Sequence, residues 1–302
     1  MDHVQHIPVL LEEVRHYIHA ESGGVYVDGT LGHGGHTEAM LNDSAPDGKV
    51  VGIELDSRNM KIAKKRLQSF GDRVLFVQGS YSDLAQHLDD LGIEKVDGIL
   101  LDVGFSSSHV DDPTRGFSFM KEGPLDMRYD FDQELTAAEV VNSWSEGELA
   151  EAFLLYGEEK QAPKIARLIV QRRREKIFRT TTDLSETIAS AIGRHGRIHP
   201  ATRVFQALRI VVNDELGSLK AVLPQAESVL KEGGRLCVIS FHSLEDRIVK
   251  KFLRRSSDLQ VVTKKPVTPL EAEQKTNPRA RSAKFRVAIK QKSNDNQEQK
   301  KT

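Results

Sequence analysis

The fold of this chain is decided by residues 27–41, VDGTLGHGGHTEAML, where a short apolar run meets a turn rich in glycine and then a helical pattern. Four glycines stand close together in this stretch, at Gly29, Gly32, Gly34 and Gly35. A glycine-rich turn directly after a strand lets the backbone approach a ligand closely and exposes the first amides of the next helix to it. The stretch therefore predicts a strand, turn and helix that together bind a ligand.

The sequence on both sides of this stretch alternates between strand and helix patterns. In the first hundred residues, helical patterns separate four apolar runs, GVYVDGT, KVVGIEL, RVLFVQG and KVDGILLDVG. Such alternation is typical of βαβ units in a parallel sheet covered on both faces. After Val103 the patterns are helical up to about Gly193, and strand patterns return in GGRLCVISF and AKFRVAIK. We predict an α/β protein: a doubly wound, mostly parallel sheet with an inserted helical domain.

These patterns also predict domain boundaries. We expect a discontinuous sheet domain formed by residues 1–107 and 200–292, a helical insertion at 108–199, and a polar, disordered tail at 293–302. Ligands of open α/β sheets bind at the carboxyl ends of the strands. The insertion follows the fourth strand at that edge, so we expect it to cover the ligand site and to recognise the substrate.

Composition limits the classes of protein to which the chain can belong. With 302 residues, 38% of them apolar, it can fill a sizeable core. No apolar run reaches the roughly 18 to 20 residues that span a bilayer, and the first residues lack a basic leader and a cleavage site. The single cysteine, Cys237, lies in an apolar run and is expected to be a buried thiol. We expect a cytoplasmic protein without a membrane partner.

The net charge is only −1, but basic residues are concentrated in two segments. Residues 161–181 contain seven basic residues and one acid, and residues 254–292 contain eleven basic residues and three acids. Such segments attract the phosphates of a nucleic acid, and a solvated helix face explains either of them equally well. Within the first segment, Arg172, Arg173 and Arg174 are expected to contribute to RNA binding, although a helix C-terminus also favours positive charge.

An acid on the second strand indicates which ligand the glycine turn holds. Glu54 ends the run VVGIEL about twenty residues after the turn, where a carboxylate can accept hydrogen bonds from two ribose hydroxyls. The glycines do not follow the spacing of a dinucleotide site cleanly. The turn therefore suits S-adenosylmethionine better than NAD, while a tight turn beside an exposed acid, without any ligand, stays open.

The fourth strand ends where the reactive part of such a ligand would lie. Asp102 stands at its carboxyl end, and Phe105 follows in a small, hydroxyl-rich turn. The N4 lone pair of cytosine is delocalised into the ring, so an acceptor on one N–H helps this nitrogen to pyramidalise, and an aromatic face can hold the base. We predict Asp102 as that acceptor, or as the group that orients the methionine end of the donor. Phe105 is expected either to stack on the base or to be an ordinary core residue.

Longer motifs carry a resemblance to a known family. They are HIPVLLEEV, VDGTLGHGGHT, DGILLDVGFSSSHVDDPTRGFSFMKEGPLDMR, HPATRVFQALRIVVNDEL and GGRLCVISFHSLEDRIVKKF. Together they resemble the bacterial 16S ribosomal RNA cytosine-N4 methyltransferases, from about His6 to Arg255. The resemblance implies a class I methyltransferase (Rossmann-like) fold with S-adenosylmethionine as the methyl donor. It also implies that the substrate is N4 of the decoding-centre cytidine 1402 in 16S ribosomal RNA, within the small ribosomal subunit.

The resemblance further implies which residues bind the donor. They form the glycine turn, the ribose-binding acid, an aromatic beside adenine and two contacts at the methionine end, namely Gly34, Gly35, His36, Glu54, Tyr81, Asp102 and His109. Three of them depart from the family pattern: Glu54 replaces a more usual aspartate, Tyr81 a phenylalanine, and His109 a glutamine. The first two exchanges keep the chemistry. His109 can donate one hydrogen bond as glutamine does, but its tautomer and charge vary near neutral pH.

Two groups of residues suggest other chemistry at first sight. His33 and His36 are three residues apart, but they lie in a glycine turn without a cysteine, so we expect no metal site. In SFHSLEDR no nucleophile elbow precedes Ser243, which excludes a hydrolase of the G-x-S-x-G type. We expect Ser243 to cap a helix with Asp246 at the third position, and His242 could face the substrate.

Two polar pairs in the second half of the chain have more than one interpretation. In GPLDMR, Asp126 and Arg128 either shape the base pocket or close a loop as an ion pair. In HPATRVFQALRI, Arg203 and Gln206 could reach the cleft, while the apolar residues between them are most simply core.

Three other functions stay open beside an RNA methyltransferase. A DNA amino-methyltransferase needs similar parts for N4 chemistry. A ribosome assembly factor could bind the donor without turnover. An NAD-dependent dehydrogenase is the most distant alternative, because the glycine spacing does not favour it.

Overall fold

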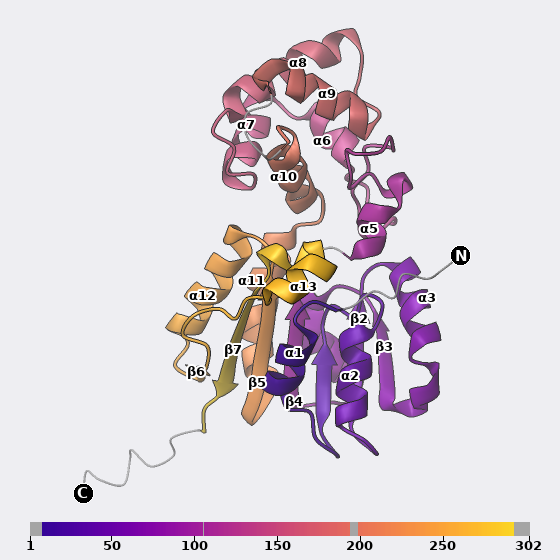
Figure 1. The fold of residues 1–302 in the computed structure, drawn as a ribbon, viewed down its shortest axis with the longest axis vertical. Coiled ribbons are helices and arrows are strands. Elements are labelled where there is room, and N and C mark those ends of the chain that lie inside the picture. Colours follow the sequence, from indigo (N-terminus) through magenta and orange to yellow (C-terminus); the bar gives the residue numbers. More distant parts are fainter. Residues whose placement is uncertain (1–7, 105, 194–198, 293–302) are drawn as a thin grey trace, which may run out of the picture. The chain divides into compact units, whose positions relative to one another are not determined.

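The structure, a computed structural model, divides into two compact units (Figure 1). Unit 1 is discontinuous and contains the sheet, whereas unit 2 is helical. Unit 1 comprises Met1–Gly104 and Gly217–Thr302, and unit 2 comprises Phe105–Leu216. The residues that the structure describes are 8–104, 106–193 and 199–292. The predicted disordered tail at 293–302 and the predicted stacking residue Phe105 lie outside the described residues.

The sheet of unit 1 has seven strands in the order β3-β2-β1-β4-β5-β7-β6. They are β1 (Val25–Asp28), β2 (Lys49–Glu54), β3 (Val74–Gln78), β4 (Val96–Asp102), β5 (Leu230–Ser240), β6 (Leu259–Val261) and β7 (Lys284–Lys290). The first five strands pair in parallel, and β7 runs antiparallel to both of its neighbours. The predicted doubly wound, mostly parallel sheet is confirmed.

Helices cover both faces of this sheet, as the continuous apolar strands require. One core cluster joins the sheet to α4, α11 and α12, and another joins it to α1, α2 and α3. The helices of unit 1 are α1 (Leu11–Ile18), α2 (Gly35–Asp43), α3 (Ser57–Arg66), α4 (Leu84–Asp90), α11 (Glu215–Val229), α12 (Ser243–Arg255) and α13 (Glu271–Thr276). The 3-10 turns of unit 1 are η1 (Gln68–Arg73), η2 (Tyr81–Asp83) and η4 (Pro278–Ser282). The first two residues of α11 belong to unit 2.

Unit 2 confirms the predicted helical insertion after the fourth strand. Its elements are α5 (Ser107–Asp111), η3 (Pro113–Arg115), α6 (Ala137–Ser143), α7 (Glu146–Leu155), α8 (Ala162–Glu175), α9 (Thr181–Ile192) and α10 (Thr202–Val212). They share a core of their own, in which Phe153 and Phe178 are fully buried.

The return to unit 1 comes later than the boundary expected at residue 200. Val204, Phe205 and Leu208 of α10 join the core of unit 2, and unit 1 resumes only at Gly217. The amphipathic pattern of α10 predicts that one helix face is buried, but the pattern alone does not identify the surface that buries it.

Two sequence expectations concern Cys237 and membrane-spanning helices. Cys237 is fully buried in β5, as expected, and burial raises the pKa of its thiol. A buried thiol of this kind is a poor nucleophile. Among the helices of the described ranges, none is long and apolar enough to span a bilayer.

Candidate functional site

The glycine turn connects β1 to α2 at the carboxyl edge of the sheet. Gly34 adopts a left-handed conformation with φ 80° and stands at the N-cap of α2. A Cβ at this position would come within 2.9 Å of Leu67 Cδ1, so both the backbone and the space favour glycine. The turn thus passes close to α3 and leaves the beginning of α2 at the edge where ligands of such sheets bind.

Three adjacent strands each end in a carboxylate at this edge. Asp28 ends β1, Glu54 ends β2 and Asp102 ends β4, and β1 lies between the other two strands. The sequence analysis singled out Glu54 and Asp102 but missed Asp28. Its position directly before the glycine turn was the available signal.

Asp28 holds the turn in place. It is almost completely buried, and its Oδ2 accepts a hydrogen bond from Thr37 Oγ1 at 2.7 Å. Its Oδ1 accepts one from the Thr30 N–H at 3.2 Å. Burial raises the pKa of Asp28, although nearby His36 and these hydrogen bonds act in the opposite direction. We conclude that Asp28 supports the turn from inside.

Glu54 also contacts the turn, and both of its carboxylate oxygens accept backbone hydrogen bonds. Oε2 accepts from the Gly32 N–H at 2.8 Å, and Oε1 accepts from the Asp56 N–H at 2.7 Å. Burial raises the pKa of Glu54 to about 7, against the effect of these hydrogen bonds. The side chain of Asn59 also hydrogen-bonds to Glu54, so of the about four lone-pair sites of a carboxylate about one stays open to a hydrogen bond from a ligand.

His36 and Asp102 lie close together without a hydrogen bond between them. The distance from His36 Nε2 to Asp102 Oδ2 is 3.7 Å, and the Asp102 N–H donates to Thr30 Oγ1 at 2.6 Å. Within the described ranges, both ring nitrogens of His36 and Oδ1 of Asp102 are buried and lack a hydrogen-bond partner. Buried polar atoms without partners are uncommon because they are costly. This pair is therefore the part of the edge that is most ready to accept a polar ligand.

Tyr81 lies beside the same turn. It begins η2, directly after β3, and is partly buried against the sheet core. A Cβ built on Gly29 would lie 3.5 Å from the Cβ of Tyr81. The structure thus brings together, in unit 1, every predicted donor-binding residue except His109.

His109 belongs to unit 2 and is 4% exposed. Its ring lies 5.0 Å from the ring of Phe117 and 4.9 Å from that of Tyr129, and these two rings stack on each other. Its Nδ1 accepts a hydrogen bond from the Ser106 N–H at 3.1 Å. A neutral His109 then carries its proton on Nε2, which can donate as a glutamine amide does. The sequence analysis did not predict this aromatic cluster.

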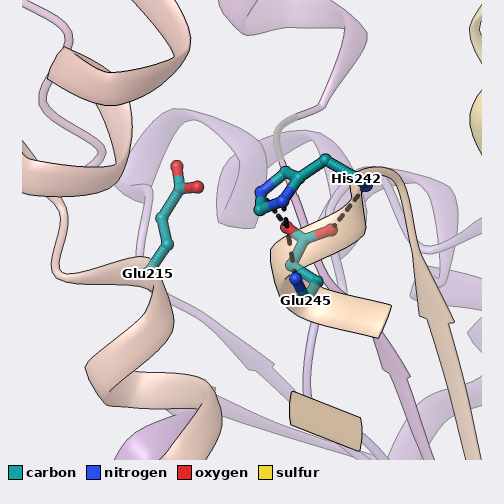
Figure 2. Close-up of side chains that lie close together, drawn as sticks. All are labelled: Glu215, His242 and Glu245. Carbon is teal, nitrogen blue, oxygen red and sulfur yellow. Dashed lines mark hydrogen bonds and ion pairs between the residues drawn. The ribbon is translucent and has the colours of Figure 1, made fainter. Parts of the chain in front are cut away.

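The loop after β5 differs from the expectation. His242, rather than Ser243, is the N-cap of α12, and Glu245 is its partner at the third position, as Figure 2 shows. Glu245 Oε2 accepts from the backbone N–H groups of Phe241 and His242 at 2.7 and 3.1 Å, and Oε1 lies 3.0 Å from His242 Nε2. The predicted cap by Ser243 and Asp246 is wrong, because Asp246 instead accepts a 2.6 Å hydrogen bond from Arg286 Nε.

The polar pairs with two interpretations make contacts inside unit 2. Arg128 and Asp126 form a two-pronged ion pair, in which Nε lies 2.9 Å from Oδ1 and Nη2 lies 2.9 Å from Oδ2. Arg128 Nη1 also donates to the carbonyl oxygens of Phe131 and Gln133. Arg203 Nη1 lies 3.8 Å from Glu159 Oε2, and Gln206 donates to the carbonyl oxygen of Tyr156. These contacts support the interpretation of Asp126 and Arg128 as an ion pair that closes a loop.

The three arginines at the end of α8 differ in their availability. Arg172 pairs with Asp183 at 3.1 Å, and Arg173 donates to the carbonyl oxygen of Val141 at 2.7 Å. Arg174 is exposed. Two of the three cations that were expected to bind RNA are thus engaged within their own unit.

Comparison with known proteins agrees with this geometry. Residues 3–291 match the MraW methylase family. A protein of Trichormus variabilis named ribosomal RNA small subunit methyltransferase H is 50% identical, covering 94% of this chain and 92% of the relative. A protein of the same name from Carboxydothermus hydrogenoformans is 48% identical, and the match covers 94% of this chain and 97% of the relative. The crystal structure of an rRNA methylase from Streptococcus thermophilus matches 93% of this chain and 94% of its own chain, with 10% sequence identity and a TM-score of 0.44. The chain belongs to the MraW methylase family and is a methyltransferase.

Proposed function

We propose that this enzyme transfers a methyl group from S-adenosylmethionine to N4 of cytidine 1402 in the 16S ribosomal RNA of the small subunit. One observation carries the proposal. Relatives that are about half identical to this chain over 94% of its length bear the name ribosomal RNA small subunit methyltransferase H. The resemblance of the motifs around Asp102 and His242 narrows the target to cytosine N4. Such a substrate places the enzyme in the cytoplasm, where small subunits are assembled.

The carboxyl edge of the unit 1 sheet fits this donor. The turn at Gly34 and Gly35 permits close approach of the adenosine part, and the remaining lone-pair site of Glu54 suits a ribose hydroxyl. Tyr81, beside the turn, offers an aromatic surface for adenine. The ring nitrogens of His36, which lack hydrogen-bond partners within the described residues, suit the polar methionine end.

The proposed chemistry assigns Asp102 a role at the amine. The donor, when bound, supplies an electrophilic methyl group on a sulfonium. As the bond from N4 to the methyl carbon forms, the bond from this carbon to sulfur breaks and sulfur keeps the electron pair. N4 must then lose one proton. Asp102 accepts a hydrogen bond from one N4–H, which helps the nitrogen to pyramidalise, and then takes up this proton.

The target base must leave its stack to reach this edge, as is usual for enzymes that modify nucleobases. The basic segments 161–181 and 254–292 supply cations for the RNA phosphates on either side of the base. Since Arg172 and Arg173 are engaged within unit 2, exposed Arg174 contributes most among the three arginines of α8. RNA methylation should therefore weaken steeply with salt.

Mass spectrometry of small-subunit RNA tests the target directly. RNA from cells that lack this protein should lose one methyl group on cytidine 1402 and regain it when the gene is restored. Purified enzyme with labelled donor should label this RNA and leave a DNA copy of the same sequence unlabelled, which separates the proposal from a DNA amino-methyltransferase. Unchanged methylation in the deleted cells would contradict the proposal.

A further inference from the structure

The outer face of α12 carries an unbroken row of cations. The helix buries Leu244, Val249 and Leu253 in the core of unit 1. Its opposite face carries five exposed basic residues spaced three and four apart, which we call the α12 stripe: Arg247, Lys250, Lys251, Arg254 and Arg255. Residues at this spacing are neighbours on a helix surface, and the row extends over about 12 Å at 1.5 Å per residue. The stripe thus presents three consecutive helical turns of positive charge.

No acid of the helix neutralises this face. The two acids of α12 lie in its first turn, where Glu245 accepts hydrogen bonds from the N-cap backbone and Asp246 pairs with Arg286. Within the described ranges, Lys250, Lys251, Arg254 and Arg255 form no ion pair. The neighbouring β7 differs, since its three cations pair with Asp246 or Asp258.

Such a row lowers the stability of the isolated helix. Like charges three and four residues apart repel one another, and only the last turn gains from the helix dipole. A face that served solubility alone would carry both signs of charge. The absence of acids from the stripe therefore indicates a ligand that supplies negative charge.

The geometry indicates which kind of ligand this is. A basic amphipathic helix can bind a membrane surface, but it then inserts its apolar side, and here that side is buried in the core of unit 1. A single small anion would engage one turn of the helix, not three. A chain of phosphates matches a row of cations, and guanidinium groups bind phosphate in a two-pronged manner. We infer that the α12 stripe is a docking surface for the phosphate backbone of the RNA substrate, an inference that rests on the proposed function.

The position of α12 in the fold supports this assignment. The helix begins directly after β5, which pairs with β4 so that Ile239 lies opposite Asp102. From there the helix runs back along β5, so Arg247 lies nearest the edge where the methyl group is transferred and Arg255 lies furthest from it, close to the start of β6. RNA held along the stripe would therefore extend away from that edge. Another helix of unit 1 with several exposed cations, α3, follows β2, which ends at the proposed ribose acid Glu54. Its exposed face is interrupted by Ile62, and Lys64 Nζ lies over the ring of Phe76.

This difference provides a matched pair of variants. The test variant replaces three cations of the stripe, Lys250→Gln, Lys251→Gln and Arg254→Gln. The control removes the same charge from α3 by Lys61→Gln, Lys64→Gln and Lys65→Gln. A third variant, Lys250→Arg, Lys251→Arg and Arg254→Lys, keeps the charge of the stripe. For each protein, fluorescence anisotropy gives the Kd of a labelled RNA copy of the 16S segment around cytidine 1402. The titrations run from about 50 to about 200 mM salt.

The stripe variant should bind this RNA at least about tenfold more weakly. The slope of the logarithm of its binding constant against the logarithm of salt concentration should be smaller in magnitude by about two to three. The α3 control and the charge-keeping variant should stay close to the wild type. All variants should keep the wild-type melting temperature and affinity for S-adenosylhomocysteine, because the exchanged side chains are exposed. In steady-state methylation the stripe variant should raise KM and leave kcat unchanged.

Three results would overturn the inference. The first is wild-type RNA affinity in the stripe variant, and the second is an equal loss of RNA affinity in the α3 control. The third is that the wild type binds phosphatidylserine vesicles and the stripe variant loses this binding while its RNA binding stays intact. A failure of the proposed function looks different, because the wild-type enzyme would then leave unmethylated small subunits unlabelled while still binding S-adenosylhomocysteine. If the wild type methylates RNA and the stripe variant binds RNA as tightly as the wild type does, the inference fails and the proposed function stands.

Discussion

At the scale of single residues, Asp102 is the group on which the proposed chemistry depends. Its Oδ1 is buried at the end of β4, where the amine of the base would approach, and has no hydrogen-bond partner among the described residues. Asp102→Asn keeps the shape and one acceptor oxygen but cannot take up a proton. Because a positioned base contributes about 10²- to 10⁴-fold, we expect kcat of Asp102→Asn to fall by about this factor. Single-turnover methylation with labelled donor measures it.

The matched control for this variant is Asp97→Asn. Asp97 belongs to the same strand, but its carboxylate accepts from the Val25 N–H at 2.8 Å and pairs with Lys231 at 2.7 Å, at the opposite end. This change should lower the melting temperature and leave kcat unchanged. Wild-type kcat in Asp102→Asn would show that Asp102 does not take the proton.

Glu54 should make the stability of the donor-free enzyme depend on pH. Burial raises its folded pKa to about 7, whereas an unfolded glutamate titrates near 4.3. Between these values the folded state binds more protons than the unfolded state, so the free energy of unfolding falls as pH rises. The part of this loss that falls between about pH 5 and about pH 8 is about 2–3 kcal/mol.

Calorimetry of the wild type and of Glu54→Gln isolates this contribution. The glutamine cannot titrate, so the stability of the wild type relative to the variant should decrease over this pH range. Subtracting the variant removes the effects of other groups, including Asp28, whose pKa is also raised by burial. A difference that stays constant with pH would contradict the assignment.

Sequence reasoning located these residues because each follows an apolar strand. Strand ends at one edge of a parallel sheet meet in space, so Glu54 and Asp102 could be placed together from their spacing alone. The state of each group could not be predicted, because it depends on contacts such as the Gly32 N–H on Glu54 and the 3.7 Å separation of His36 from Asp102. The aromatic neighbours of His109 were missed for the same reason.

At the scale of secondary structure, the start of α12 is held by one buried carboxylate. Glu245 is 2% exposed and accepts two backbone N–H groups, so Glu245→Ala leaves both without a partner. We expect a loss of about 2–3 kcal/mol in the free energy of unfolding, since buried unsatisfied donors cost about 1–3 kcal/mol each. Urea unfolding of unit 1, followed by circular dichroism, measures this loss.

The capping box at the start of α7 provides the comparison. Glu148 accepts from the Ser145 N–H at 2.7 Å in the same arrangement, but both side chains are exposed. Glu148→Ala should lower the free energy of unfolding much less than Glu245→Ala does, because water can replace the lost acceptor. Equal losses in the two variants would show that the burial of Glu245 does not matter.

The elements that sequence reasoning placed wrongly or missed have physical reasons. Ser243 was expected as the cap of α12 because serine is a favoured N-cap, whereas His242 takes that position through its ring. The strand β6, Leu259–Val261, was missed, because three residues are too few to show an alternating pattern. The long strands and helices were predictable, since their periodic patterns extend over whole elements.

At the scale of the whole molecule, each unit has its own core. We expect S-adenosylhomocysteine, at about 100 times its Kd, to stabilise unit 1 by about 2.7 kcal/mol and so to raise its melting temperature. The only tryptophan, Trp144, packs against the core of unit 2 and reports on that unit. Its fluorescence transition should stay in place while a calorimetric transition moves upward.

Two results decide this expectation. A shift of the calorimetric transition alone agrees with two units that unfold separately, each about its own core. A single transition that moves together with the Trp144 signal would show that the units unfold as one. S-adenosylhomocysteine should have no effect on either transition in a variant that cannot bind it, such as Gly34→Val, where a side chain would collide with Leu67.

The discontinuity of unit 1 also has a consequence for protein synthesis. β4 ends at Asp102, but its partner β5 begins only at Leu230, after all of unit 2 has been translated. At about 5–20 residues per second, a nascent chain carries β4 with one edge unpaired for on the order of ten seconds. An unpaired apolar strand invites aggregation, so newly made chains need a chaperone or a rapidly folding unit 2 to shield this edge.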